Sequence, residues 1–258
     1  MYLVAGLGLS GQSVLRYFAN QGERCYAFDT RAELDIDHLQ AQYPQVKFAT
    51  GSLPASWIKK IDSLVLSPGI AKSSAWVTPF LQSGKEVIGD IELFARSVGQ
   101  PIVAITGSNG KSTVTTLVAQ ALQQAGYAVG MGGNIGKPAL DLLLDDNEYE
   151  VYVLELSSFQ LETTYSLQAT SAALLNISED HMDRYDSLES YLQAKLSILD
   201  HAEWSVLPKR FAHVKPVSTQ HESHFGVEQT FKPLQENDYG LVQKNDQAWL
   251  GWGDHAAV

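Results

Sequence analysis

Cysteine is almost missing from this sequence, since Cys25 is the only one in 258 residues. One cysteine excludes an intramolecular disulfide and a zinc site made of several thiolates. Long hydrophobic runs are missing too, because no apolar stretch approaches the roughly 20 residues of a membrane-spanning helix. The first residues, Met1–Gly6, hold no basic segment of the kind that opens a secretory signal. We therefore expect a cytoplasmic protein with no membrane partner.

Basic residues are scarce relative to acidic ones. The chain has 18 Lys and Arg against 29 Asp and Glu, a formal net charge of −11. Residues 1–90 are balanced, with 8 basic and 8 acidic side chains, so the whole excess lies in residues 91–258. A surface of this charge repels polyanions and argues against a nucleic-acid partner. Small phosphate ligands are compatible with it where backbone amides or metal ions receive them.

The first 90 residues alternate between strand and helix patterns. Short apolar runs predict strands at Tyr2–Ala5, Arg24–Phe28, Ser63–Leu66 and Glu86–Ile88. A helical spacing between the first two runs closes at Gly22, which suits a helix C-terminus. Strands separated by helices indicate a parallel sheet covered on both faces. We expect a Rossmann-like domain over residues 1–90.

A second unit follows over residues 91–258. Its expected strands are Ile102–Ile105, Val151–Leu156 and Ala172–Leu175. The helix after the first of these runs to about Ala125, with an expected buried face of Leu117, Val118, Ala121 and Leu122. Ser187 is typical of a helix N-cap, and residues 241–250 suggest a hairpin around Lys244–Gln247. The whole chain is therefore predicted to be α/β, with a P-loop-type α/β domain after the Rossmann-like one.

A glycine fingerprint joins the first strand to the first helix. Gly6-x-Gly8-x-x-Gly11, with Asp29 closing the next strand, is the dinucleotide-binding pattern in its expected place. We favour a nucleotide other than NAD(H), and a purely structural glycine turn is the third interpretation. Asp29 can accept a hydrogen bond from a ribose or from a uracil N–H. Arg31 is a candidate phosphate ligand, although an exposed arginine is usually only solvated.

Residues Thr106–Thr113 form the stronger signal. A Gly-Lys-Ser sequence lies here between a buried strand and the start of a helix. Its backbone amides and Lys111 can bind phosphates, and the hydroxyl of Ser112 or Thr113 can bind Mg²⁺. It departs from the common ATPase loop, because Ile105 stands where a glycine is usual. We predict an ATP site formed by Gly107, Ser108, Asn109, Gly110, Lys111, Ser112 and Thr113.

Three single residues follow the later strands. Glu155 lies inside a buried apolar run, where a carboxylate is costly without a charged partner, and Mg²⁺ is the natural one. His181 stands among acidic residues after a strand end, which suits a metal. Lys195 lies among apolar residues on a helix, and the sequence alone favours an ordinary lysine whose amine reaches solvent. The glycine run around Asn134 is by default a plain loop.

Together these segments resemble the Mur ligase family, and within it the member that adds D-glutamate. The matches occur in family order over roughly residues 2–200. They are Gly6–Gly11, Asp29–Arg31, Ser67–Ile70, Gly89–Phe94, Thr106–Thr113, Gly132–Gly136, Leu154–Glu162, Glu179–Tyr185 and Ala194–Leu196. One departure is Ser10, where the family commonly has Thr.

The resemblance implies an ATP-dependent ligase of peptidoglycan synthesis. It would join D-glutamate to UDP-N-acetylmuramoyl-L-alanine through an acyl phosphate, as a monomer and with two Mg²⁺ ions. The implied catalytic residues are Lys111, Glu155, His181 and Lys195. The implied metal-binding residues are Ser112, Thr113, Glu155, His181 and Lys195, the last as a carbamate formed with CO₂.

The resemblance also implies where the UDP-substrate binds. The uridine and diphosphate end would contact the first domain, and the muramoyl-alanine end the second. The implied residues are Gly8, Leu9, Ser10, Asp29, Thr30, Arg31, Ser67, Pro68, Gly69, Asn134, Ser157, Gln160 and His181.

The family has a third, C-terminal domain for which these 258 residues hold no counterpart. We therefore expect a truncated chain that binds UDP-substrate better than it turns it over. Three alternatives remain: a related amide ligase such as one acting on folate, an NAD-dependent oxidoreductase fused to an ATPase, and a non-catalytic UDP-sugar-binding module. Binding of UDP-N-acetylmuramoyl-L-alanine separates the first from the proposed ligase. Quenching of nicotinamide fluorescence on titration would support the second, and phosphate release with all three substrates excludes the last.

Overall fold

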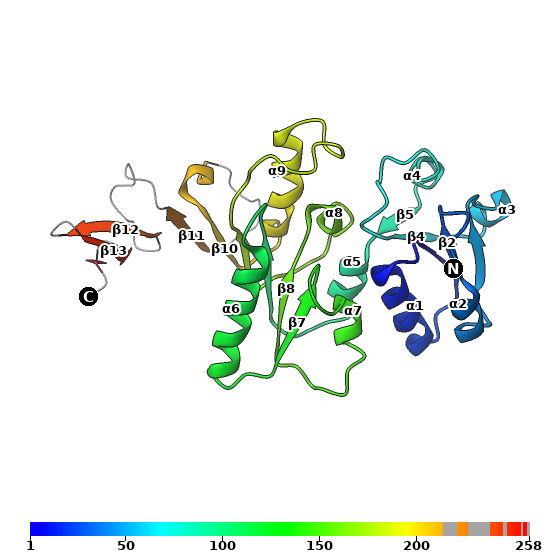
Figure 1. The fold of residues 1–258 in the computed structure, drawn as a ribbon, viewed down its shortest axis with the longest axis horizontal. Coiled ribbons are helices and arrows are strands. Elements are labelled where there is room, and N and C mark those ends of the chain that lie inside the picture. The colour runs from blue at the N-terminus through cyan, green and yellow to red at the C-terminus, as the bar shows by residue number, and fades with distance from the viewer. Residues whose placement is uncertain (214–220, 227–237, 245–246, 254, 257–258) are drawn as a thin grey trace.

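A computed structural model gives the fold. It describes residues 1–213, 221–226, 238–244, 247–253 and 255–256. Two β-sheets lie one after the other along the long axis of the molecule, each flanked by helices (Figure 1). The α/β class predicted from the alternating patterns is confirmed.

The first sheet is wholly parallel, in the order β3-β2-β1-β4-β5. Its strands are β1 Tyr2–Ala5, β2 Cys25–Asp29, β3 Lys47–Thr50, β4 Ser63–Leu66 and β5 Glu86–Ile88. Apolar clusters cover both faces, one holding Val4 and Phe18 and the other Leu3 and Phe80. This burial on two sides explains why the strands are continuous apolar runs.

The second sheet has the order β14-β13-β12-β11-β10-β9-β6-β8-β7. Its strands are β6 Ile102–Thr106, β7 Val129–Gly133, β8 Val151–Glu155, β9 Ser171–Leu174, β10 Trp204–Pro208, β11 His221–Gly226, β12 Asp238–Lys244, β13 Gln247–Trp252 and β14 His255–Ala256. The part from β7 to β12 is parallel, and β12 to β14 are antiparallel. The expected hairpin is thus the β12–β13 pair, although its turn residues 245–246 lie outside the described residues.

The helices cover the sheets from both sides. They are α1 Leu9–Gln21, α2 Asp37–Gln42, α3 Ala55–Ile58, α4 Thr78–Gln82, α5 Asp90–Ala95, α6 Lys111–Gln124, α7 Ala139–Leu142, α8 Ser158–Leu161 and α9 Leu188–Leu196, with 3₁₀ turns at Ser197–Leu199 and Lys209–Phe211. Gly22 ends α1 in the left-handed conformation at φ 69°, as expected, and the Ser187 hydroxyl caps α9. The part of the chain that the structure describes contains no helix long and apolar enough to cross a membrane.

The predicted buried face of α6 is right for Val118 and Leu122, which pack against the core, and wrong for Leu117 and Ala121, which are exposed. Leu117 is 59% exposed, and the fully buried residues are the smaller Thr115 and Ala119. Small side chains let the helix approach the sheet closely, and Val118 and Leu122 pack beside them. The helix is therefore rotated about its axis relative to the face that the larger apolar residues suggested.

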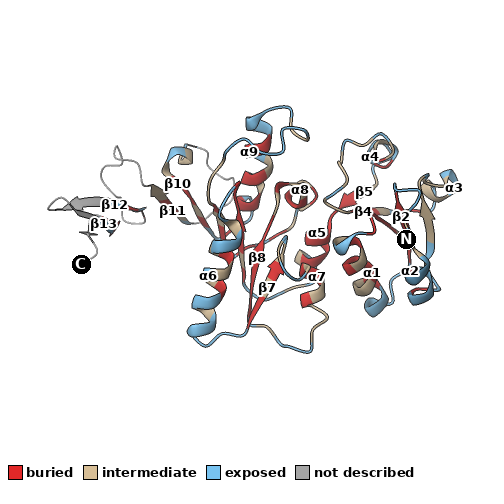
Figure 2. Cartoon of the chain, in the orientation of Figure 1, coloured by how far each residue is buried: buried red, intermediate tan, exposed pale blue. Residues whose placement is uncertain are grey.

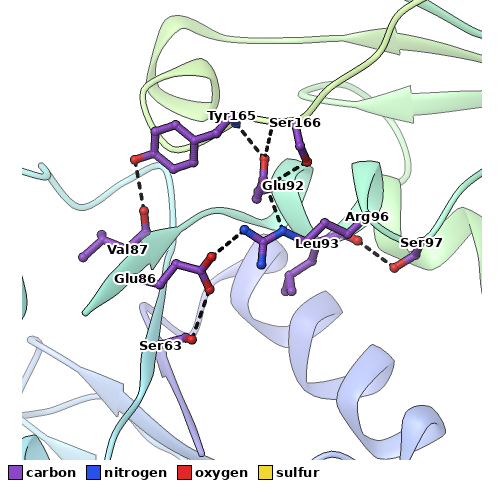
Figure 3. A network of polar contacts seen from close by, with 9 residues as sticks. All are labelled: Ser63, Glu86, Val87, Glu92, Leu93, Arg96, Ser97, Tyr165 and Ser166. Atoms are coloured by element: carbon purple, nitrogen blue, oxygen red, sulfur yellow. Dashed lines mark hydrogen bonds and ion pairs between the residues drawn. The ribbon is translucent and has the colours of Figure 1, made fainter. Parts of the chain in front are cut away.

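Helix α5 joins the two units (Figure 2 shows it largely buried). Its Glu92 is 1% exposed and accepts hydrogen bonds from the backbone N–H groups of Tyr165 and Ser166 at 2.6 and 2.9 Å. Arg96 bridges Glu92 and Glu86 at 2.8 and 2.6 Å (Figure 3). The network ties the edge of the first sheet to the segment after α8.

A second ion pair crosses between the units. Arg16 of α1 donates two hydrogen bonds to Asp141 of α7, at 2.9 and 2.6 Å, and the buried Ser13 hydroxyl donates a third at 3.0 Å. This ion pair, like the one between Arg96 and Glu86, holds the first unit against the second.

Candidate functional site

Strand order brings three distant segments to one edge of the second sheet. β6 lies between β8 and β9, and all three are parallel, so their carboxyl ends are neighbours. The segments that follow these strands are 107–110, 156–157 and 175–181. Open α/β sheets bind ligands at such carboxyl ends.

The predicted phosphate loop is fixed by a residue that the sequence patterns did not single out, Asn176. Its Oδ1 accepts from the Asn109 N–H at 2.8 Å, and its Nδ2 donates to the Asn109 carbonyl at 2.9 Å. Ser108 donates its N–H to the Asn176 carbonyl at 3.0 Å, and its hydroxyl accepts from the Ser178 N–H at 3.0 Å. A Cβ on Gly107 would press against Leu175 at 3.0 Å, so the loop also needs its glycine there. Loop 107–110 is thus braced by the end of β9.

Helix α6 begins directly after this loop. Gly110, at φ 77°, is its N-cap, and Lys111 folds back so that Nζ donates to the Ser108 carbonyl at 3.0 Å. Ser112 and Thr113 are both exposed, and it is Ser112 that donates its hydroxyl to Glu155 Oε2, at 2.7 Å. Of the two hydroxyls predicted as Mg²⁺ ligands, the structure brings Ser112 to the carboxylate.

Glu155 closes β8 and is 1% exposed. Besides Ser112, it accepts from Asn134 Nδ2 at 2.8 Å. The Asn134 N–H also donates to the Glu155 carbonyl at 2.8 Å, so the glycine run after β7 is anchored here and is not a free loop. No lysine or arginine in the described parts of the chain forms an ion pair with Glu155. A buried carboxylate held by neutral donors alone fits a divalent cation, which would be bound by Glu155 and Ser112.

Lys195 is 2% exposed, so the expectation of a lysine reaching solvent is wrong. Its Nζ lies 3.4 Å from Thr106 Oγ1 and 4.7 Å from the centre of the Tyr191 ring. Burial, and secondly the nearby Lys111 charge, lower the pKa of the amine to about 7, while Asp180 and Glu155 oppose the shift. The sequence could not show this, because the apolar neighbours of Lys195 fit a surface helix equally well.

His181 lies beside Tyr191, the residue whose ring Lys195 also contacts, with the two ring centres 6.3 Å apart. It is exposed, adopts φ 57°, and its ring centre lies 4.7 Å from that of Phe159. Its Nε2 is 3.4 Å from Asp180, its neighbour in sequence. Within the described ranges, no three His, Cys, Asp or Glu side chains form a ready metal cluster. The structure therefore groups Ser112, Glu155 and Asn134 beside the phosphate loop and leaves His181 and Thr113 outside this group.

The glycine fingerprint forms the turn predicted for it in the first unit. Helix α1 begins at Leu9, and a Cβ on Gly11 would overlap the Gly6 carbonyl oxygen. Asp29 Oδ2 accepts from the Leu7 N–H at 2.8 Å. Burial of Asp29 raises its pKa, but the hydrogen bonds from Arg31 and Leu7 outweigh burial and bring the pKa down to about 2.

Arg31 binds both oxygens of Asp29, at 2.8 Å each, and its side chain is 60% exposed. The Asp29 carboxylate is therefore already paired. Leu9 is 77% exposed beside this turn, Thr30 and Gly69 are exposed, and Gly8 has open space around it. Ser67 and the half-buried Pro68 follow β4, and Ser67 lies against Gly6. The first-unit residues predicted for the UDP-substrate thus share one edge of the first sheet.

Ser157 and Gln160 form a capping box on α8. Gln160 donates its N–H to the Ser157 hydroxyl at 3.2 Å, and Gln160 Oε1 accepts from the Ser157 N–H at 3.0 Å. Gln160 is 2% exposed. These two predicted muramoyl contacts are thus held rigidly at the carboxyl end of β8.

Comparison with known proteins supports the same arrangement. Residues 1–89 match the family model of the Mur ligase MurD-like N-terminal domain, and residues 105–239 match that of the Mur ligase middle domain. Over all 258 residues the chain is 66% identical to the UDP-N-acetylmuramoylalanine–D-glutamate ligase of Hydrogenovibrio crunogenus, of which it covers 57%. It is 47% identical to the ligase of the same name from Alcanivorax borkumensis over 247 residues, 95% of this chain and 54% of that protein. The chain thus spans about half the length of the curated relatives it matches.

Solved structures show the same fold at low sequence identity. A murein peptide ligase from Psychrobacter arcticus superposes with a TM-score of 0.53 at 15% identity, over 98% of this chain and 58% of that one. A MurF ligase from Thermotoga maritima gives 0.51 at 17% identity, over 98% and 53%. Since the middle-domain model alone matches more than half of the residues, the chain belongs to the Mur ligase family.

Proposed function

We propose that this chain carries the UDP-substrate-binding and ATP-binding parts of a cytoplasmic, monomeric ligase that joins D-glutamate to UDP-N-acetylmuramoyl-L-alanine. The observation that carries the proposal is the environment of Glu155. Its carboxylate is buried, forms no ion pair with a basic side chain of the described residues, and accepts a hydrogen bond from Ser112 beside the phosphate loop. The domain division supports it, because the first sheet ends at Ile88 and the second begins at Ile102. Residues 1–90 would bind the uridine end and residues 91–258 would bind ATP.

The reaction needs a site that lets two anions meet. The carboxylate of the UDP-substrate would attack the γ-phosphorus of ATP and release ADP, and the amine of D-glutamate would then displace phosphate from the acyl phosphate. Mg²⁺, when bound, supplies positive charge between the carboxylate and the phosphates. Glu155 and Ser112 would hold one ion, and the Lys111 amine and the loop amides would bind phosphate oxygens. His181 and a modified Lys195 are the proposed residues for a second ion.

The surroundings of Lys195 support the proposed carbamylation. A buried ammonium beside Lys111 would oppose cation binding, whereas a carbamate adds negative charge and two oxygen ligands. The neutral amine would attack the carbon of CO₂, forming an N–C bond and releasing a proton. A carbamate carbon resonance in ¹³C-bicarbonate buffer, absent from Lys195→Met, is the expected result. Identical spectra of the two proteins would contradict the modification.

Titration calorimetry tests the function. The chain should bind UDP-N-acetylmuramoyl-L-alanine, and separately ADP in the presence of Mg²⁺. Glu155→Gln removes the proposed Mg²⁺ ligand and should weaken Mg²⁺-dependent ADP binding at least tenfold, with UDP-substrate binding unchanged. Glu148→Gln, which alters an exposed carboxylate, is the matched control. A wild-type chain that fails to bind the UDP-substrate would contradict the proposal.

A further inference from the structure

The loop between β4 and α4, residues 67–77, extends from the first unit toward the second. It opens with Ser67, one of the residues proposed to bind the UDP-substrate, and its apolar residues Ile70 and Trp76 pack on the core of the first unit. In the described parts of the chain, the hydrogen bonds between this loop and the second unit are those donated by Lys72. Lys72 is therefore the polar link between the loop and the second unit.

Lys72 contacts the segment directly after α8. Its Nζ donates to the Tyr165 hydroxyl at 2.8 Å and to the Glu162 carbonyl at 3.4 Å, and it lies 5.2 Å from the centre of the Tyr165 ring. The ammonium is thus held by a hydroxyl, a carbonyl and the electrons of an aromatic ring. Lys72 is half-buried, so its amine does not simply extend into solvent.

Tyr165 is itself fixed by residues on the other side of the joint. Its hydroxyl donates to the Val87 carbonyl of β5 at 3.1 Å (Figure 3), and its N–H donates to Glu92 of α5 at 2.6 Å. Because the single hydroxyl proton is directed at Val87, the hydroxyl oxygen is free to accept from Lys72. The position of Lys72 is thus determined by a side chain of the second unit whose own orientation is set.

This contact lies between the two groups of residues that are proposed to bind the UDP-substrate. Ser67 precedes Lys72 in the same loop, and Gln160 precedes Glu162 at the end of α8. Tyr165 is 48% exposed, and a lysine–tyrosine contact that is so open to solvent adds little to the stability of a fold. What the contact determines is the distance between the loop and α8.

We propose that Lys72 and Tyr165 form a latch that sets the spacing between the two halves of the UDP-substrate site, with Lys72 as a positioning residue. The inference rests on the proposed function, in which Ser67 receives the diphosphate end and Gln160 the muramoyl-alanine end. With the latch closed, a ligand that spans both halves has less ordering of the protein to compensate for. A ligand that contacts only the first unit gains nothing from it.

Titration calorimetry with UDP-N-acetylmuramoyl-L-alanine and with UDP tests the latch. Lys72→Met keeps an unbranched apolar side chain and removes the ammonium. It should weaken the full substrate about fivefold, at the low end of typical couplings between sites, and UDP by less than about twofold. Tyr165→Phe keeps the ring and removes the hydroxyl, and it should also weaken the full substrate more than UDP. The midpoints of urea unfolding should stay close to that of wild type for both variants.

Lys47→Met is the matched control. Lys47 also lies beside a tyrosine, with its Nζ 5.8 Å from the centre of the Tyr26 ring, but both of these residues belong to the first unit. The control removes one positive charge from the first unit, as Lys72→Met does, and it should leave the ratio of the two affinities at the wild-type value. Equal weakening of both ligands by Lys72→Met would show that only the charge of Lys72 matters, and would overturn the latch.

A double-mutant cycle completes the design. The loss of full-substrate affinity from Tyr165→Phe should be smaller in the Lys72→Met background, because the hydroxyl then has no ammonium to hold. Additive losses, or an unchanged ratio of affinities in Lys72→Met, would overturn the inference while leaving the proposed function intact. If wild type binds ADP with Mg²⁺ but not the UDP-substrate, the proposed function itself fails, and the latch fails with it.

Discussion

At the scale of single residues, two buried ionisable groups define the candidate site. Glu155 is held by the neutral donors Ser112 and Asn134, and Lys195 by Thr106 and the Tyr191 ring. Neither has an ion-pair partner in the described residues, although buried charges are normally paired. Both therefore carry a cost in free energy that a metal ion, or a change of charge at Lys195, would remove.

The pKa of Lys195 predicts how stability depends on pH. The pKa of Lys195 is about 7 in the folded protein, against an ordinary value of 10.5. Between pH 7 and 10.5 the unfolded chain therefore binds up to one proton more than the folded protein. The free energy of unfolding should then rise with pH in this window, by roughly 1.4 kcal/mol per pH unit. Relative to Lys195→Met, wild type should gain about 2 kcal/mol between pH 7 and 9, because the folded amine is still half protonated at pH 7.

Urea unfolding at each pH, in metal-free and CO₂-free buffer, measures this difference. Lys60→Met, which changes an exposed lysine, should follow the wild-type curve. Parallel curves for wild type and Lys195→Met would show that the Lys195 amine does not lose its proton in this window.

At the scale of elements, the apolar runs predicted the positions of the main strands to within a residue or two. Local patterns suffice there, because a strand buried on both faces must be apolar throughout. They failed for part of the buried face of α6, where Leu117 is exposed and Thr115 is buried. Which side of a helix meets a sheet depends on how closely the two backbones approach, and that is set by residues far away in sequence.

In the candidate site too, some residues could be predicted from local patterns and others could not. The phosphate loop and Glu155 could be predicted, since their residue types stand directly after strand patterns. Asn176 could not, because its role depends on a partner, Asn109, that only the strand order brings near. Long-range contacts of single polar side chains leave no periodic trace in a sequence.

Two glycines of the first turn give a matched pair of variants. Gly11→Ala places a Cβ on the Gly6 carbonyl oxygen and should destabilise the fold by about 3 kcal/mol, because the start of α1 must move away from β1. Gly8→Ala should be nearly neutral, since Gly8 has an ordinary φ of −78° and open space around it. The midpoints of urea unfolding check both. Equal losses would mean that the turn tolerates no side chain for a reason other than this overlap.

At the scale of the whole molecule, Glu92 anchors the joining helix α5 to the second unit, and its partner Arg96 extends this contact to Glu86 of the first. Burial raises its pKa, but the N–H groups of Tyr165 and Ser166, the Ser166 hydroxyl and Arg96 outweigh burial and hold the pKa below the ordinary 4.5. These hydrogen bonds to Glu92 therefore stabilise the fold fully when the pH is above 4.5. Their contribution is lost as the pH falls through the lower pKa of Glu92 in the folded protein.

Glu92→Gln should consequently destabilise the protein most at neutral pH, by about 2 kcal/mol, a typical cost for charged hydrogen bonds that are lost. The difference from wild type should shrink as the pH falls below about 4.5. Thermal unfolding from pH 7 to pH 3 measures it, with Glu148→Gln as an exposed control. A difference that is constant with pH would show that the charge of Glu92 contributes nothing.

The order of strands also has a consequence for synthesis on the ribosome. The first sheet is complete once Ile88 has been made, so it can form while the remainder is still being translated. β6 must instead wait for β8 and β9, its two neighbours, which emerge much later. The phosphate loop therefore acquires its shape only after Asn176 has left the exit tunnel, although its own residues were made long before.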